Sequence, residues 1–164
     1  MTQSEQFLME AFAGESQANR RYLAFAQQAE KEGYHQVAKL FRAAAKAETV
    51  HAHAHLRALK GIKSTAENLK AAISGETHEF NIMYPAMIGT ARLEGNKEAE
   101  QSFKYANEVE KTHASLFEKA LANLGKQAEV DYSVCSVCGY TWEFEPPEKC
   151  QLCGTKAKQF FKVG

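Results

Sequence analysis

Apolar residues recur at intervals of three and four positions through the first 124 residues, which is the period of amphipathic α-helices. The stripes and their stop signals predict four long helices, over approximately residues 2–33, 34–60, 75–94 and 96–125. Thr2-Gln3-Ser4-Glu5 has the form of a capping box at the start of the first helix, and Gly33 ends it. Because short links join the first helix to the second and the third to the fourth, we expect two antiparallel pairs in a mainly α four-helix bundle.

Two features interrupt this pattern. Ser64-Thr65-Ala66-Glu67 forms a second capping box, and we expect it to open a brief helix, to about Ile73, that carries the chain across to the far end of the bundle. Pro85 lies inside the third predicted helix. Because proline lacks an N–H, we expect a bend close to Tyr84.

The composition changes after the fourth helix. Residues 125–131 form a short polar linker, and residues 132–164 are rich in aromatic side chains, turn residues and cysteines. So short a segment with few aliphatic residues normally needs a metal or disulfides to fold. The predicted organisation is a helical domain over 1–124, a linker over 125–131 and a small β/loop metal module over 132–164.

Charge and cysteine usage limit the classes of partner and compartment. The chain has 20 basic and 20 acidic residues, so no net field favours nucleic acid or an anionic membrane. The N-terminus lacks the features of a secretory signal, and no apolar run approaches membrane-spanning length. All four cysteines lie in two Cys-x-x-Cys pairs, which favour metal binding in a reducing compartment. A cytoplasmic protein is predicted.

The pattern Glu-x-x-His occurs twice on the apolar stripes, as Glu48 with His51 and as Glu110 with His113. On a helix, this spacing places the carboxylate and the imidazole one turn apart on the same face. Unpaired charges are very unfavourable inside a bundle, so these side chains need a compensating cation. One such pair is weak evidence, but two on matching helices argue against solvated surface charges.

Single glutamates precede each pair at matching distances: Glu15 lies 33 residues before Glu48, and Glu76 lies 34 residues before Glu110. One Glu from each of two helices and Glu-x-x-His from each of the other two make a carboxylate-bridged dinuclear site. Glu79, one turn after Glu76, adds a seventh candidate ligand. Ligands of this type suit iron or manganese, and zinc stays open.

Tyrosines lie within reach of these acids. Tyr22 is two turns from Glu15, and Tyr84 is beside the acids of the third helix. Each could hydrogen-bond a ligating carboxylate or a bound oxidant, and each could equally be a core residue with a satisfied hydroxyl.

The second predicted metal site consists of two knuckles with a glycine after each second cysteine. The four cysteines are Cys135, Cys138, Cys150 and Cys153. The spacing predicts a tetrahedral four-thiolate site, which could hold zinc or iron. The neighbouring dinuclear site favours iron, because iron in four thiolates passes single electrons without a change of ligands.

Together these motifs make the chain resemble the rubrerythrin family over nearly its whole length. The residues that carry the resemblance are Phe12-Ala13-Gly14-Glu15-Ser16, Ala47-Glu48-Thr49-Val50-His51, Gly75-Glu76-Thr77-His78-Glu79, Met83-Tyr84-Pro85, Glu110-Lys111-Thr112-His113 and both cysteine knuckles. The resemblance implies a ferritin-like di-iron four-helix bundle followed by a rubredoxin-like domain with one Fe(Cys)4 centre.

The resemblance also implies residue roles. The two irons of the bundle would be bound by Glu15, Glu48, His51, Glu76, Glu79, Glu110 and His113. Glu48 and Glu110 would be the bridges, and one iron would exchange Glu79 for His51 on redox change. Tyr22 and Tyr84 match tyrosines that support the reaction.

The implied activity is a peroxidase that reduces hydrogen peroxide to water in oxidative-stress defence. Electrons would come from a donor protein, such as a rubredoxin or an NAD(P)H-dependent reductase, through the Fe(Cys)4 centre. About eleven residues from His113 to the end of its helix span roughly 16 Å, and the linker adds more. We therefore expect the chain's own cysteines to lie far from its own acids, which favours a head-to-tail homodimer or higher homo-oligomer.

Two other interpretations remain open from the sequence. A ferritin-like protein that oxidises or stores iron, or that reduces oxygen, would use the same bundle but leave Glu79 and the cysteine module without a role. Alternatively, a structural zinc ribbon could act as an interaction module attached to a helical bundle.

Overall fold

The computed structural model describes residues 1–163, and the chain divides into two compact units, residues 1–63 and the segment from Ser64 onward. Each unit is described by itself. The fold class predicted from the sequence is confirmed: the chain is mainly helical, with a small sheet at the C-terminal end. No helix among residues 1–163 is long and apolar enough to span a membrane.

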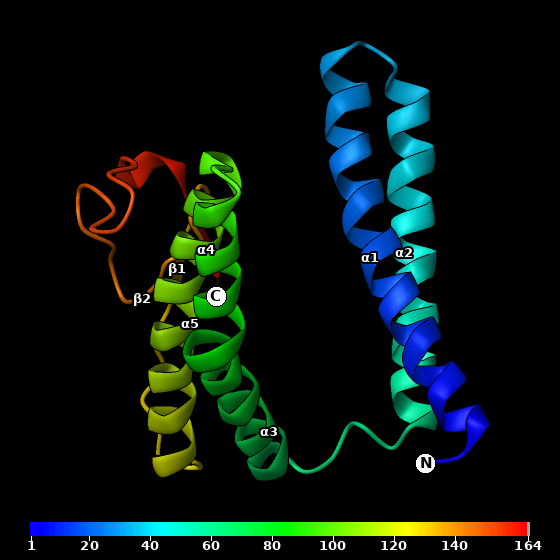
Figure 1. The fold of residues 1–164 in the computed structure, drawn as a ribbon, viewed down its shortest axis with the longest axis horizontal. Coiled ribbons are helices and arrows are strands. Elements are labelled where there is room, and N and C mark those ends of the chain that lie inside the picture. Colours follow the sequence, from blue (N-terminus) through cyan, green and yellow to red (C-terminus); the bar gives the residue numbers. More distant parts are fainter. Residues whose placement is uncertain (164) are drawn as a thin grey trace. The chain divides into compact units, whose positions relative to one another are not determined.

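The first unit is an antiparallel hairpin of α1 (Gln3–Lys31) and α2 (His35–Ala58), drawn in blue and cyan in Figure 1. The expected capping box at Thr2 is present, and Gly33 adopts a positive φ of 83° in the connecting turn. Small side chains let the two helices approach closely: the buried residues of the hairpin are Ala26, Ala29, Ala38, Ala45 and Ala52. Larger apolar residues such as Phe25 and Leu40 are exposed.

The second unit begins with one uninterrupted helical run. It consists of α3 (Thr65–His78), a π-helical turn η1 (Glu79–Met83) and α4 (Tyr84–Leu93). The prediction of a separate crossover helix over residues 64–73 is therefore wrong, because that segment forms the first turns of this run. Its capping box at Ser64 is present. The run packs antiparallel against α5 (Lys97–Ala122), which Asn96 caps (Figure 1).

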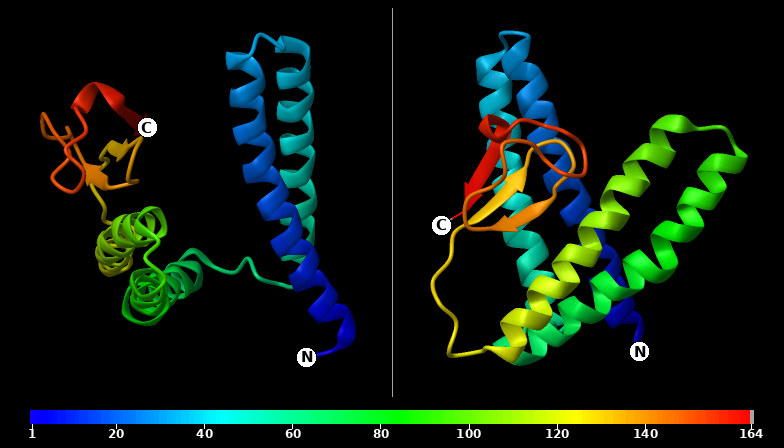
Figure 2. Two further views of the ribbon diagram at one scale, coloured as in Figure 1. Left: turned by 45° about the horizontal axis from the view of Figure 1, so that its top comes forward. Right: turned by 90° about the vertical axis from the view of Figure 1, so that its left-hand side faces the viewer.

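The C-terminal module is a three-stranded antiparallel sheet in the order β2-β1-β3 (Figure 2). Its elements are β1 (Tyr132–Cys135), β2 (Thr141–Glu143), the 3-10 turn η2 (Ala157–Gln159) and β3 (Phe160–Val163). Trp142 packs against Tyr140 and Phe160 with ring centroids 4.6 and 4.8 Å apart. The predicted boundaries at 124, 131 and 164 stay predictions, and Gly164 lies outside the described residues.

Candidate metal centres

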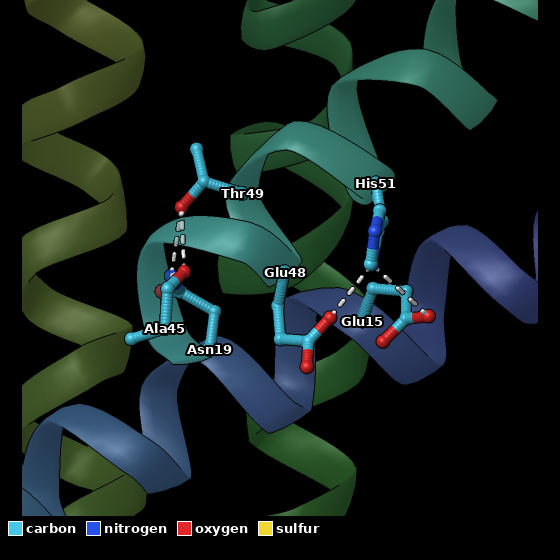
Figure 3. Close-up of polar contacts among 6 residues, drawn as sticks. All are labelled: Glu15, Asn19, Ala45, Glu48, Thr49 and His51. Carbon is cyan, nitrogen blue, oxygen red and sulfur yellow. Dashed lines mark hydrogen bonds and ion pairs between the residues drawn. The ribbon is translucent and has the colours of Figure 1, made fainter. Parts of the chain in front are cut away.

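Three side chains of the hairpin converge in what we name the first acid group, which consists of Glu15, Glu48 and His51 (Figure 3). Nδ1 of His51 lies 2.8 Å from Oε2 of Glu48 and 3.9 Å from Oε1 of Glu15. The Glu-x-x-His spacing explains the shorter contact, because residues three apart share one helix face. The group is open: the His51 side chain is 55% exposed.

Two hydrogen bonds from the Asn19 side chain, named here the Asn19 lock, fix the register of α1 against α2 beside this group (Figure 3). Nδ2 of Asn19 donates to the backbone oxygen of Ala45, at 2.6 Å, and to Oγ1 of Thr49, at 2.8 Å. Asn19 lies one turn after Glu15, and Thr49 directly follows Glu48. The lock therefore holds the two carboxylates at one level along the hairpin.

Glu76, Glu110 and His113 form an equivalent set in the second unit, named here the second acid group. Nδ1 of His113 lies 2.7 Å from Oε2 of Glu110 and 3.9 Å from Oε1 of Glu76. The repeated sequence pattern thus gives the same imidazole geometry in both helix pairs. This group is less exposed, with the His113 side chain only 30% accessible.

The charges of the second acid group are poorly compensated. Burial, and then the negative charge of Glu110, raise the pKa of Glu76 above its ordinary value. Among residues 1–163, neither carboxylate forms an ion pair with a lysine or arginine. A cation between these acids would remove this unfavourable interaction.

Glu100, on the same α5 helix, shows how this protein balances a buried acid by side chains alone. Its carboxylate is bonded by Lys104 at 2.8 Å, by Arg92 at 2.7 Å and by Lys97 at 3.4 Å. The hydrogen bonds from Lys104 and Arg92 lower the pKa of Glu100 to about 2. The second acid group has only an imidazole in place of these three cations, which fits a site built for metal.

The π-helical turn changes the surroundings of the second acid group. The backbone N–H of Tyr84 donates to the oxygen of Glu79, five residues back, and Pro85 follows without an N–H of its own. In a regular α-helix, a residue five positions further on lies about 140° away around the axis. The wider turn instead brings Tyr84 closer to the helix face of Glu79. Where we expected a bend close to Tyr84, the structure has a wide turn, of a kind frequent at functional sites.

Tyr84 lies close enough to the acids to respond to them. Burial, then the charges of Glu110, Glu79 and Glu76, raise the pKa of its hydroxyl. Glu79 itself is not within either acid group. Tyr22 packs against Phe25 and Phe41, with ring centroids 6.4 and 6.1 Å apart. The roles expected for these residues remain predictions.

The four cysteines converge as the knuckle spacing predicts, with their Sγ atoms within 4.8 Å of one another. Sγ of Cys135 lies 3.5 Å from Sγ of Cys153, and Cys138 and Cys150 are equally close. Gly139 and Gly154 have positive φ angles of 81° and 77°, which allow the tight turn after each second cysteine.

The cysteine thiols differ in the direction of their pKa shifts. Burial raises the pKa of Cys138 and of Cys150. For Cys153, burial is outweighed by hydrogen bonds from Thr155 and from neighbouring thiols, which lower its pKa to about 6. Four close thiolates need a cation to ionise together, and zinc or iron supplies it.

The cysteine module lies against α5 of its own chain. Nε2 of His113 is 3.1 Å from Oγ1 of Thr141, and Nζ of Lys119 is 2.6 Å from Oε2 of Glu143. The large separation that we expected between a chain's cysteines and its own acids is therefore wrong for the second acid group, because the segment after α5 turns back along the helix.

Sequence reasoning missed Asn19, Thr49 and Thr141 as polar partners near the acids. The helical period places Asn19 on the apolar stripe, and an asparagine in such a stripe signals a buried hydrogen bond. The contact of Thr141 depends on the path of the linker, for which the sequence carries no local signal.

Comparisons with known proteins find relatives for both the helical part and the cysteine module of the chain. The Rubrerythrin family model matches residues 6–121, and the rubredoxin-like domain of rubrerythrin matches residues 134–161. The chain is similar to rubrerythrin-2 of Clostridium acetobutylicum, with 38% identity over 94% of this chain and 93% of that protein. Rubrerythrin of Porphyromonas gingivalis is 37% identical over 93% of this chain and 86% of that protein.

Solved structures give the same relationship. A mixed-valence structure of nigerythrin has a TM-score of 0.60 and 31% identity, covering 99% of this chain and 88% of that one. Nigerythrin of Nitratidesulfovibrio vulgaris is also 33% identical to the chain over 89% of its length and 79% of that protein. The acid groups and the four cysteines are consistent with the iron of these proteins. With its helical pairs and its rubredoxin-like module, the chain belongs to the rubrerythrin family of di-iron proteins.

Proposed function

We propose that this protein is an oxidoreductase that reduces hydrogen peroxide to water: H2O2 + 2 e⁻ + 2 H⁺ → 2 H2O. The observation that carries the proposal is the presence, in one chain, of two acid groups of equal geometry and a four-thiol site. Dinuclear carboxylate sites bind oxidants, and a tetrathiolate iron passes the electrons singly.

The residues of the two acid groups fit a dinuclear site when the groups face each other, within one chain or between two. Glu15, Glu48 and His51 would hold one side and Glu76, Glu110 and His113 the other, with Glu48 and Glu110 as bridges. Bound iron would supply Lewis acidity and the two electrons of the reaction. Zinc binds similar donors but lacks the redox step.

Other side chains would serve the oxidant. A tyrosine hydroxyl is protonated at neutral pH, and burial with the neighbouring acids raises the pKa of Tyr84 further, so Oη can donate a hydrogen bond to a peroxide oxygen beside the acids. Glu79, at the start of the π-helical turn, would exchange with His51 as a ligand when the redox state changes. Tyr22 would support the first acid group from α1.

The physiological partners belong to the same proposal. A rubredoxin or an NAD(P)H-dependent reductase would reduce the Fe(Cys)4 centre, in a cytoplasmic homodimer or higher homo-oligomer. The exposed Phe25 and Leu40 of the hairpin give a second copy apolar surface to cover. Light scattering on the iron-loaded protein checks this point, and a monomer would contradict it.

Replacing Glu79 with Ala tests the assigned chemistry. We expect peroxide turnover to fall by about tenfold or more, while the fold and the colour of the Fe(Cys)4 centre are kept. Glu94→Ala, on the exposed end of the same helical run, is the matched control. Unchanged turnover in Glu79→Ala would contradict the role. Ferrous protein that dioxygen oxidises and peroxide barely oxidises would indicate an oxidase or an iron-storage protein instead.

A further inference from the structure

One face of the cysteine module lies along α5. A Cβ built on Gly139 would lie 4.0 Å from the Val109 side chain, Thr141 contacts His113, and Glu143 pairs with Lys119. Residues 139, 141 and 143 thus lie beside positions progressively further along the helix. The central contact of this face joins Thr141 to His113.

The hydroxyl of Thr141 can act as a hydrogen-bond donor on one side and as an acceptor on the other. Oγ1 donates to the backbone oxygen of Gly139 at 3.2 Å, so its proton is engaged within the knuckle. Its lone pairs are then left to accept from Nε2 of His113, 3.1 Å away, in the tautomer that carries the proton on Nε2. The other ring nitrogen, Nδ1, points at the carboxylates of Glu110 and Glu76.

We propose that Thr141 is a positioning residue for the metal site. By accepting from Nε2–H it selects the tautomer of His113 whose Nδ1 lone pair is available as a ligand, and it fixes the plane of the ring. An outer hydrogen bond of this kind orients a histidine ligand and raises its basicity. The inference rests on the proposed function, and it gives the cysteine module a second role. Besides delivering electrons, the module holds a ligand of the dinuclear site.

The first acid group has no equivalent of this contact. Among residues 1–163, Nε2 of His51 has no hydrogen-bond partner, and the His51 ring is nearly twice as exposed as that of His113. An unanchored ring can turn toward and away from a metal, whereas an anchored ring cannot. The expected exchange of Glu79 for His51 therefore involves the histidine whose ring has no anchoring hydrogen bond among the described residues.

Two classes of variant separate positioning from simple docking. Thr141→Val keeps the shape of the side chain and removes Oγ1, whereas Thr141→Ser keeps the hydroxyl. Glu143→Gln weakens the neighbouring pair with Lys119 and leaves Thr141 intact, so it reports what looser docking does on its own.

The experiment uses the full chain labelled with ¹⁵N-histidine and loaded with Zn²⁺, which is diamagnetic and binds the same donors. Nuclear magnetic resonance then identifies which nitrogen of His113 binds the metal and how fast Nε2–H exchanges with water. Competition with a chelator gives the Zn²⁺ and Fe²⁺ dissociation constants of the acid groups.

We expect wild type, Thr141→Ser and Glu143→Gln to bind through Nδ1 with a protected Nε2–H. In Thr141→Val, exchange should be at least about tenfold faster and metal binding about 10- to 100-fold weaker, the usual cost of losing such a partner. The inference would be overturned if Thr141→Val kept wild-type protection of Nε2–H and wild-type metal affinity, or if His113 of the wild type bound the metal through Nε2. Either result would leave the proposed metal site itself unchallenged. A wild-type chain that binds no metal outside its cysteines would overturn the proposed function itself.

Discussion

The two acid groups have the same ligand geometry and different supports. In each, Nδ1 of the histidine lies 2.7–2.8 Å from the glutamate one turn earlier and 3.9 Å from the glutamate of the partner helix. The first group depends on a lock between its own two helices, through Asn19. The second depends on Thr141, which comes from a separate metal module. A repeated motif thus fixes ligand geometry, while non-repeated residues decide how firmly each half is held.

Removing a bridging carboxylate should have the largest effect. In Glu110→Gln, one proposed bridge loses its charge, so we expect affinity for metal in the acid groups to fall by about 100-fold or more, with loss of peroxide turnover. Metal analysis after gel filtration measures the loss. Glu108→Gln is the matched control, because Glu108 lies on the same helix and its carboxylate, within residues 1–163, pairs with Lys111 alone. Full occupancy in Glu110→Gln would refute the assignment of the bridge.

Loss of the cysteine centre should disturb the second acid group more than the first. Cys150→Ser removes a ligand from a module that lacks a sufficient core, so we expect residues 132–163 to lose protection against amide exchange. The red absorption of ferric tetrathiolate should disappear as well. Because Thr141 is then released, Nε2–H of His113 should lose protection, while the contacts of His51 stay unchanged. Equal changes at both histidines would contradict the difference in support.

The π-helical turn can be tested through Tyr84. Pro85→Ala restores an N–H, so we expect the turn to tighten into regular helix and to move the hydroxyl away from the acids. The raised pKa of Tyr84 should then fall toward the ordinary tyrosine value. Ultraviolet titration measures this shift, with Tyr84→Phe identifying the transition of this residue. A pKa that stays raised in Pro85→Ala would show that the wide turn is not its cause.

Breaking the lock of the first acid group should have a smaller, local effect. Asn19→Ala removes two hydrogen bonds between α1 and α2, so we expect a loss of about 1–2 kcal/mol in the free energy of unfolding. Denaturant unfolding of the metal-free protein measures it. Gln17→Ala is the control, since Gln17 is exposed and its side chain accepts a hydrogen bond from Arg21 of the same helix. An equal loss of unfolding free energy in Asn19→Ala and Gln17→Ala would show that the hydrogen bonds of Asn19 do not stabilise the hairpin.

Glu100 should give the smallest effect and a characteristic pH dependence. Its pKa is lowered to about 2 in the folded chain, so the carboxylate stabilises the fold above the pKa of an unfolded glutamate. That contribution is lost as the pH falls from about 4.5 toward 2. Glu100→Gln should therefore melt at a lower temperature than wild type at pH 7, and the difference should vanish near pH 2. A difference independent of pH would contradict the ionic role.

Local sequence patterns were sufficient for most of the helices and for the residues that converge in the two acid groups, whereas the assignment of ligands, including Glu79, stays a prediction. Capping boxes located the helix starts at Thr2 and Ser64, and the Glu-x-x-His spacing with the upstream glutamates predicted both acid groups. The crossover helix was wrong because a capping box marks where a helix starts and carries no information on how far it continues. The π-helical turn and the contact of Thr141 depend on tertiary packing, which local spacing does not encode.

Reoxidation of the fully reduced protein tests the central claim most directly. Iron analysis should give two irons per chain in the acid groups and one among the cysteines, and stopped-flow absorption should follow mixing with hydrogen peroxide or with dioxygen. The account predicts rapid oxidation by peroxide and a much slower reaction with dioxygen. Iron confined to the cysteines, or ferrous protein that peroxide leaves reduced, would contradict it.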